Sequence, residues 1–413
     1  MRMLLFTQYF WPENFRINEL IRSLTASGHQ VTILTGKPNY PDGKIFAGYR
    51  AWGIQREQYA GADVIRIPMI PRGKPSALRL AINYLSFIFS GFVFGPLVLR
   101  NRQYDVVFVY GLSPLLQVLP AIFLASLKRA PLIVWVQDLW PESLSATGYV
   151  RNRFLLAAVE AVVRHIYRHS DSILIQSEAF RGPIARLLGD SRRIRYFPNS
   201  AEAIFGAAGG SEGGGALASA IRQRFSIVFA GNIGSAQAVG TIVDAAAMLT
   251  EQPDIRFVLV GSGSEMGWLK SEVQRRKLQN VSLTGRLPVT DMPAIFSAAS
   301  ALLVTLKNEA IFAYTIPGKI QSYLAVGRPI IACLDGEGAR VVAEAGAGIV
   351  CPAEDARALA DAVLSLVAMS AERRTQMGEN GRRYFSENFE QVKLVDGLVQ
   401  HIGAVIAARG AAG

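Results

Sequence analysis

The feature that most constrains the fold is a pattern of buried strand, amphipathic helix and buried strand that opens the chain and starts again past its middle. Residues 2–10 are apolar enough for a buried strand, and apolar residues three and four apart over 17–24 predict a helix that Gly28 can end. The β-branched run at 31–34 predicts the next strand. Such a unit joins parallel strands through a right-handed crossover, so we expect an α/β protein.

Two such series follow one another along the chain. The first half adds predicted strands at 104–111, 130–138 and 171–177 and a helix over 151–170. The run GGSEGGGALASA at 209–220 has few side chains to bury and is typical of a linker. After it the strand and helix pattern resumes. We therefore predict two Rossmann-like, doubly wound domains that face each other across a cleft. The expected parts are a first domain over 1–205, a linker over 206–220, a second domain over 221–385, and a C-terminal helix over 386–413 that crosses back to the first domain.

Composition narrows the classes of partner. Half of the 413 residues are hydrophobic and the formal net charge is +11, which favours an acidic partner such as an anionic membrane face or a phosphorylated small molecule. No zinc-finger spacing and no basic block interleaved with aromatics is present, so nucleic acid is not expected. Cys333 and Cys351 lack metal-site spacing; a disulfide between them stays open, although a lone pair fits a reducing compartment. The N-terminal apolar stretch is too short for a secretion signal, so we expect a cytoplasmic protein.

Residues 77–100 form an apolar stretch of about the length that spans a bilayer. Arg79 and Asn83 interrupt it, and Gly95-Pro96 is expected to break it. Three interpretations stay open: a membrane span, a buried crossover helix, or a helix lying in the membrane surface. The flanking cations favour contact with anionic lipid. They are Arg72, Lys74, Arg79, Arg100 and Arg102.

Three strand-to-loop junctions in the second half are suited to an anion. The stretch FAGNIGSAQ places Gly231 and Gly234 after a strand, and LVGSGSE does the same with Gly261 and Gly263. The third is TIPGKIQSYLAVGRPIIA at 315–332, in which Lys319 stands where a helix begins. Helix N-termini carry free N–H groups and partial positive charge, which suit a phosphate. Arg286 follows a predicted strand and Lys307 ends one. With Lys319, these cations are candidates to hold a diphosphate, with solvated surface cations as the alternative.

With these motifs the chain resembles the retaining nucleotide-sugar glycosyltransferases of family 4, which have the two-domain GT-B fold. It is most similar to the subgroup that builds bacterial surface polysaccharides, such as colanic-acid and O-antigen enzymes and N-acetyl-L-fucosamine transferases. The resemblance covers nearly the whole chain. It is carried by QYFWPENFRINEL near the start, GHQVTILTGKPNYPDGKIFAGY (28–49), QDLWPES (137–143), FPNS (197–200), FAGNIG (229–234), VGSGSE (260–265), TGRLPVTDMPAIFSAAS (284–300) and PGKIQSYLAVGRPII (317–331).

The resemblance implies a donor site in the second domain, with two departures from the family pattern. The family's two glutamates, eight positions apart, correspond here to Tyr314 and Ser322, with Gln321 adjacent. The family's Arg corresponds to Asn232, and its Lys falls near Ala236 or Gln237. Lys319 and Arg286 are our candidates to replace that charge pair as catalytic residues. The expected donor-binding residues are Asn232, Gly234, Gly261, Gly263, Lys307, Tyr314, Pro317, Gly318, Gln321 and Ser322.

The first domain is expected to hold the acceptor. Asp138 ends a buried strand and Glu142 follows it, so these acids are candidates to orient or deprotonate a sugar hydroxyl, with helix capping as the alternative. Further acceptor-binding candidates stand at the first helix and at the junction of the two halves; plain capping, or a turn at the junction, is the alternative for them. They are Glu13, Asn14, Arg16 and Asn199.

The function expected from this resemblance is retaining transfer of a sugar, an N-acetylated deoxyhexosamine, from a UDP-sugar to a lipid-diphosphate-linked acceptor at the inner face of the bacterial cytoplasmic membrane. No Asp-x-Asp triplet is present, so we expect no metal and no other cofactor. Two rival functions stay open: a UDP-sugar 2-epimerase of the same fold, and a non-catalytic component that binds nucleotide sugar or lipid. UDP release that depends on an added acceptor distinguishes transfer from both.

Overall fold

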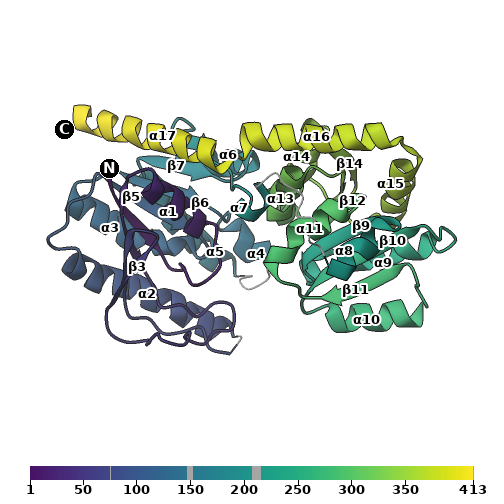
Figure 1. The fold of residues 1–413 in the computed structure, drawn as a ribbon. Coiled ribbons are helices and arrows are strands. Elements are labelled where there is room, and N and C mark those ends of the chain that lie inside the picture. Colours follow the sequence, from purple (N-terminus) through teal and green to yellow (C-terminus); the bar gives the residue numbers. More distant parts are fainter. Residues whose placement is uncertain (75, 147–151, 207–214, 413) are drawn as a thin grey trace. The chain divides into compact units, whose positions relative to one another are not determined.

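A computed structural model of the chain describes residues 1–74, 76–146, 152–206 and 215–412 (Figure 1). The chain forms two compact units. Unit 1 contains Met1–Pro198 and Gln391–Gly413, and unit 2 contains Asn199–Glu390. The chain therefore leaves unit 1 after Pro198 and returns to it at Gln391. The boundary between the units follows Pro198, before the predicted end of the first domain at 205. Residues 215–220 of the predicted linker belong to a helix in unit 2. Residues 207–214 of that linker lie outside the described residues.

Unit 1 is built on an eight-stranded sheet in the order β3-β4-β2-β1-β5-β6-β7-β8. All neighbouring pairs are parallel except β3 and β4, which form an antiparallel hairpin at one edge. The strands are β1 (Arg2–Thr7), β2 (Gln30–Thr35), β3 (Gln55–Tyr59), β4 (Ala62–Arg66), β5 (Val106–Gly111), β6 (Leu132–Val136), β7 (Ser172–Ile175) and β8 (Ile194–Tyr196). The helices are α1 (Ile17–Ala26), α2 (Ala77–Val98), α3 (Val118–Lys128), α4 (Glu142–Ala146), α5 (Arg153–Arg168), α6 (Arg181–Leu188) and α17 (Gln391–Ala412).

The last helix of the chain completes the core of unit 1. Val395, Leu398 and Ile402 of α17 are buried in one apolar cluster with Ile17 and Leu20 of α1 and with residues of β1, β2 and β5. The predicted first helix spans Ile17–Ala26, and Gly28 follows it with φ +80°, as its place after the helix end requires.

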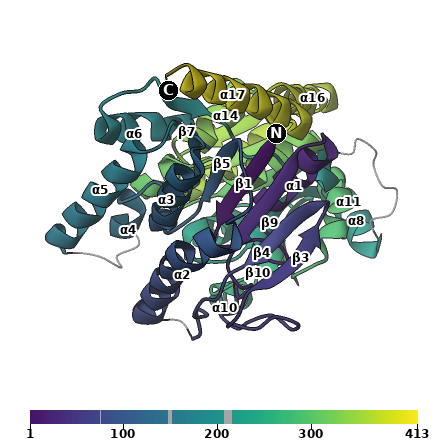
Figure 2. The ribbon, with the colours of Figure 1, turned by 90° about the vertical axis from the view of Figure 1, so that its left-hand side faces the viewer.

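Helix α2 connects β4 to β5 across the sheet, so it has the connectivity of a crossover helix (Figure 2). Its buried side includes Asn83, whose side-chain amide donates to the Ile70 carbonyl and accepts from Gln8 at 2.8 Å. By length and apolar composition α2 would suffice to cross a membrane, and a third of its most apolar stretch is buried in unit 1. The expected break at Gly95-Pro96 is wrong, because the helix runs to Val98. Pro96 lies in the last turn, where a missing N–H removes a single bond.

Unit 2 is built on a six-stranded parallel sheet in the order β11-β10-β9-β12-β13-β14. The strands are β9 (Phe225–Asn232), β10 (Ile255–Ser262), β11 (Val281–Gly285), β12 (Ala301–Thr305), β13 (Ile330–Cys333) and β14 (Gly348–Cys351). The helices are α7 (Ala203–Gly206), α8 (Gly215–Arg222), α9 (Val239–Met248), α10 (Met266–Arg275), α11 (Met292–Ala298), α12 (Ala310–Ala313), α13 (Gly318–Val326), α14 (Glu337–Glu344), α15 (Ala356–Ala368) and α16 (Ala371–Asn388).

Both faces of the unit 2 sheet are covered by helices, which explains its nearly continuous apolar strands. Val228 and Val258 pack with α8, α11, α13 and α14 on one face, whereas Ile227 and Phe257 pack with α9, α10 and α15 on the other. A doubly wound parallel sheet of this kind gathers strand ends and helix N-termini at its carboxyl edge, where ligands bind.

Candidate functional site

At the carboxyl ends of β9 and β10, two glycines present backbone without a side chain. Gly231 and Gly261 stand opposite each other in the parallel register, with φ +134° and +146°. A Cβ added to Gly261 would lie 1.8 Å from the Gly231 carbonyl oxygen, and one added to Gly263 would lie 2.2 Å from that of Ile233. Both positions therefore exclude larger residues, and the two strand ends and their loops approach closely without side chains between them.

Lys319 lies against this bare backbone. It is the second residue of α13, and its Nζ stands 3.5 Å from the centroid of the Phe229 ring. A Cβ on Gly231 would lie 2.7 Å from Lys319 Cε, so the side chain occupies the space that a larger residue at 231 would take. Nζ has essentially no exposed surface and no hydrogen-bond partner among the described residues. Burial of the ammonium lowers the pKa of Lys319 to about 7.

The loops after β9 and β12 meet next to this position. The backbone N–H of Lys307 donates to the Ala236 carbonyl at 3.0 Å, and Thr305 Oγ1 donates to the Gln237 carbonyl. The Gln237 side chain in turn accepts from Asn232 Nδ2 at 3.4 Å and from the Gly234 N–H at 3.3 Å. Four of the predicted donor-binding positions, Asn232, Gly234, Lys307 and Gly261, are thus at neighbouring strand ends of one sheet.

The start of α13 holds four more predicted positions, with different exposures. Pro317 precedes the helix and the exposed Gly318 begins it, so the N–H groups of Gly318 and Lys319 have no partner within the helix. The N–H of Ile320 donates to the Pro317 carbonyl at 2.9 Å. Gln321 and Ser322 face inward: the Gln321 amide is fully buried and can donate to the Pro317 carbonyl, and Ser322 Oγ donates to the Gly318 carbonyl at 3.4 Å. Tyr314, after α12, is half-buried.

Arg286 has a different setting from Lys319. It is exposed and follows β11, the edge strand, and β10 lies between that strand and β9. The predicted partnership of Arg286 with Lys319 stays a prediction.

In unit 1, Asp138 and Glu142 lie in the loop after β6 and at the start of α4. An Asp138 carboxylate oxygen accepts the backbone N–H of Ser113 at 3.1 Å, and the Ser113 hydroxyl accepts from Trp140 Nε1 at 2.9 Å. Burial raises the pKa of Asp138 above its ordinary value, against the lowering effect of the Ser113 hydrogen bonds.

The carboxylate of Glu13 is occupied by the protein's own backbone. It is almost fully buried and accepts three backbone N–H groups, from Asn39 at 2.8 Å, Tyr40 at 2.7 Å and Phe10 at 3.2 Å. Burial raises the pKa of Glu13 to about 7 in spite of these bonds. Glu13 therefore ties the loop after β1 to the loop after β2. The other acceptor candidates differ from it, since Asn14 is exposed and Arg16 and Asn199 are half-buried.

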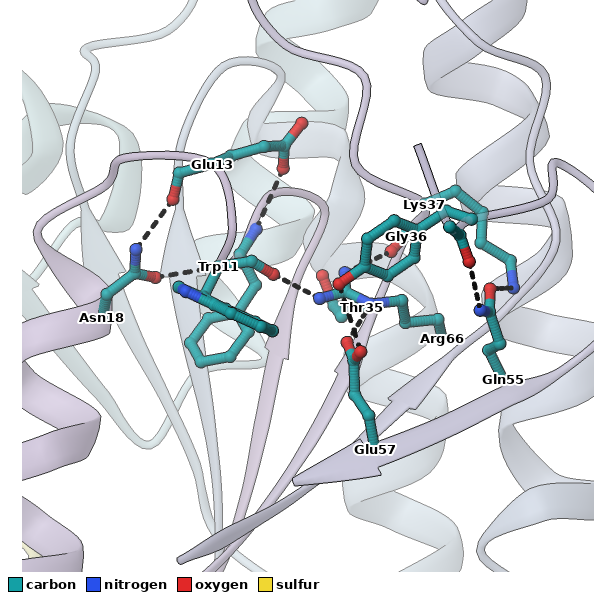
Figure 3. Close-up of polar contacts among 12 residues, drawn as sticks. Trp11, Glu13, Asn18, Thr35, Gly36, Lys37, Gln55, Glu57 and Arg66 are labelled. Carbon is teal, nitrogen blue, oxygen red and sulfur yellow. Dashed lines mark hydrogen bonds and ion pairs between the residues drawn. The ribbon is translucent and has the colours of Figure 1, made fainter. Parts of the chain in front are cut away.

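Two buried cations beside Glu13 were missed by the sequence reasoning. Arg66, at the end of β4, is fully buried, pairs with Glu57 at 2.5 Å, donates to the Gly36 and Trp11 carbonyls and lies 4.9 Å from the Tyr49 ring (Figure 3). Lys37, just after β2, donates to Gln55 Oε1 at 3.0 Å, and burial lowers its pKa to about 8. The available signal was their position: each stands at the carboxyl end of a parallel strand, as Lys307 does in unit 2.

Two family profiles together match most of the chain. The one described as "Glycosyl transferase 4-like domain" matches residues 14–200, and the one described as "Glycosyl transferases group 1" matches residues 224–369. WcaI of Escherichia coli K12 is 27% identical to this chain over 321 residues, which are 75% of this chain and 76% of WcaI. Its name describes a glycosyl transferase of colanic acid biosynthesis. O-antigen chain mannosyltransferase C of Escherichia coli is 30% identical over 161 residues, which are 38% of this chain and 41% of that protein.

Solved structures resemble the chain over almost its full length. HepE of Anabaena, in complex with UDP, superposes with a TM-score of 0.70 at 14% identity and covers 98% of this chain and 100% of its own. Sucrose-phosphate synthase of Thermosynechococcus elongatus gives a TM-score of 0.73 at 17% identity, covering 98% and 99%. At these identities the likeness shows the fold, which consists of two Rossmann-like α/β domains.

Proposed function

We propose that this chain, a glycosyltransferase with the GT-B fold, moves a sugar from a UDP-sugar to a lipid-diphosphate-linked acceptor in the biosynthesis of a bacterial surface polysaccharide. The names of WcaI and of O-antigen chain mannosyltransferase C support the polysaccharide, and UDP in HepE supports the donor. We further propose that the anomeric configuration is retained and that the sugar is an N-acetylated deoxyhexosamine, as the resemblance of the motifs implies.

The observation that carries the proposal is Lys319, a buried cation without a hydrogen-bond partner among the described residues, set between bare glycine backbone and the first turn of α13. When the sugar leaves, negative charge grows on the β-phosphate. A cation and free N–H groups aimed at that charge act in a water-poor site, and each such donor is worth about 2–4 kcal/mol of barrier. Lys319 and the α13 N-terminus are proposed to supply them, with Lys307 and Arg286 as further cations at the same edge of the sheet.

The acceptor is proposed to bind in unit 1, with Asp138 orienting its hydroxyl and Glu142 in the same loop. Burial raises the pKa of Asp138, so its environment favours the neutral form more than water does, and we propose that it holds that hydroxyl by a hydrogen bond without taking its proton. The carboxylate of Glu13 already accepts three backbone N–H groups. We therefore propose that Glu13 positions the loops that carry Asn14 and Tyr40. The departing phosphate is proposed to take the proton of the acceptor, so that neither a protein nucleophile nor a metal ion is needed.

The test is acceptor-dependent release of UDP. The protein is incubated with a panel of UDP-sugars, with and without polyprenyl-diphosphate-linked sugars, and UDP is measured. Release that requires the acceptor supports transfer. Conversion of the UDP-sugar to its 2-epimer without release would support the epimerase instead, and tight UDP binding without either reaction would support a non-catalytic component.

We propose that the acceptor is reached at an anionic membrane surface on which α2 lies. One side of α2 exposes large apolar side chains, with Leu78, Leu85, Phe89 and Leu97 each at least 60% exposed. Phe123 and Leu127 of α3, which packs against α2 through Phe92 and Phe123, extend this apolar surface. Exposed apolar patches of this size, rimmed by cations, mark interaction surfaces.

The cations at the rim differ in their availability. Arg72, Lys74, Arg79 and Arg100 form no ion pair with described residues, so their charges can meet anionic lipid, although the Arg72 guanidinium also lies 5.1 Å from the centroid of the Tyr40 ring. The charge of Arg102 is already paired within the protein, because its guanidinium donates to Asp63 at 2.6 Å and to Thr32 at 3.0 Å. The test is sedimentation with vesicles that contain anionic lipid. Arg72→Glu with Lys74→Glu should release the protein from them, whereas unchanged partitioning would reject the electrostatic contact.

A further inference from the structure

The surroundings of Lys319 Nζ are unusual for a lysine. On β9 it lies over the ring of Phe229 and beside Gly231, and it forms no hydrogen bond with the described residues. From its own helix, the nearest titratable group is Tyr323, whose hydroxyl accepts the Ala230 N–H and donates to the Leu303 carbonyl, and burial raises the pKa of that phenol. No ion pair joins Lys319 to a carboxylate of the described residues, although the loops at this edge of the sheet carry acids as well as the cations Lys307 and Arg286. The acids are Glu265, Glu309, Asp335 and Glu354, and Glu354 accepts the Asn308 N–H at 2.8 Å.

An ammonium in such a place has lost its hydration and gained only the face of one aromatic ring. Desolvation is the cause that lowers the pKa of Lys319 to about 7, so near neutral pH the free protein contains both the amine and the ammonium. A diphosphate beside Nζ would supply the missing counter-charge and restore a strongly charged hydrogen bond.

We propose that the binding of a nucleoside diphosphate shifts Lys319 to its protonated form, so that binding above neutral pH takes up close to one proton from the solvent. The inference rests on the proposed donor site in unit 2 and adds a property that the site itself does not require. The proton comes from the acid form of the buffer and ends on Nζ, and no covalent bond of the nucleotide changes. Above pH 7 the neutral amine predominates in the empty site, so little unpaired charge is buried there, and the ammonium predominates once the diphosphate is bound.

Because binding is coupled to protonation of Lys319, the affinity for the diphosphate should fall as the pH rises. Below pH 7 most of the free protein already carries the proton, so binding takes up little. At pH 8 about 0.9 of the molecules must gain one, for a group with a pKa near 7 in the free state and well above 8 in the complex. The apparent dissociation constant should then rise roughly 50-fold from pH 7 to pH 9, since the fraction of competent, protonated protein falls by that factor.

The experiment is calorimetric titration of UDP into the full chain at pH 8, in buffers that differ in ionisation enthalpy. At this pH the terminal phosphate of UDP is already ionised, because its pKa lies near 6. The slope of observed heat against ionisation enthalpy counts the protons taken up, and we expect about 0.9 per UDP. A slope of zero with normal UDP binding would overturn the inference and leave the proposed function standing. No UDP binding at all would overturn both.

Three variants sharpen the result. Lys319→Arg keeps a cation that never loses its charge, so any UDP it binds should be bound without proton uptake and with little change between pH 7 and pH 9. Lys319→Met should bind UDP weakly, also without uptake. Lys270→Met is the matched control, because Lys270 is exposed on α10, and it should keep the wild-type slope. Uptake that persists in Lys319→Arg would assign the proton to another group and contradict the inference.

Discussion

Replacing Gly231 by alanine should displace the Lys319 side chain and so impair its function, although Lys319 itself is unchanged in sequence. The new Cβ would lie 2.7 Å from Lys319 Cε and 3.2 Å from Nζ, and these atoms belong to the flexible end of a side chain, so Lys319 moves rather than the backbone. The backbone itself must hold an alanine at φ +134°, which costs about 1–3 kcal/mol of stability.

The effect on catalysis should exceed the effect on stability. A misplaced Lys319 forfeits a charge contact worth about 2–4 kcal/mol in the transition state, which corresponds to a fall in kcat/KM of roughly 30- to 1,000-fold. The assay is acceptor-dependent UDP release, with urea unfolding to confirm that the variant is folded.

Gly240→Ala is the matched control. Gly240 lies in α9, and a Cβ there would meet only Trp268 at an ordinary 3.5 Å. Its kinetics should stay within twofold of the wild type, and its stability should be equal or slightly higher, since alanine is the better helix former. If Gly231→Ala proved folded and as active as Gly240→Ala, the reasoning about Lys319 would be refuted.

The remaining predictions concern Glu13, Glu57 and the requirement for a metal ion. Because the pKa of Glu13 is raised to about 7 in the folded state, its ionisation opposes folding, and the free energy of unfolding should fall as the pH rises from 4.5 to 7. Urea unfolding of Glu13→Gln should show a smaller fall of that free energy over the same window. Equal falls in the wild type and the variant would contradict the assignment. Glu57→Gln removes the charge that pairs with the buried Arg66 and should destabilise the protein by about 3–5 kcal/mol in the same assay, whereas a loss below ~1 kcal/mol would show that the carbonyl bonds suffice. A chelator should leave acceptor-dependent UDP release unchanged, and a loss that Mg²⁺ or Mn²⁺ restores would reject the metal-free scheme.

The buried strands and the helices between them could be predicted from the sequence because parallel strands covered on both faces are continuous apolar runs. The edge hairpin of β3 and β4 was not predicted. Its strand Gln55–Tyr59 is mostly polar and partly exposed, so it carries no apolar signal, and its pairing with β4 depends on the turn at Ala60 and Gly61, both with positive φ.

At the candidate site, the sequence indicated the glycines and the lysine of α13, because these residue types have a local meaning at strand and helix ends. It did not reveal that Lys319 Nζ is buried over Phe229, since that contact joins residues 90 positions apart. For the same reason it offered Glu13 for acceptor binding or for capping, and it could not show that the carboxylate accepts the N–H groups of Asn39 and Tyr40. Burial and partners of a charged group are set by the tertiary structure.

A crystal structure of the protein with UDP would measure the central contact directly. The account predicts a β-phosphate oxygen within about 3 Å of Lys319 Nζ, above the backbone of Gly231 and Gly261. Diphosphate bound elsewhere, with Nζ still buried over Phe229 and without an anionic partner, would contradict it.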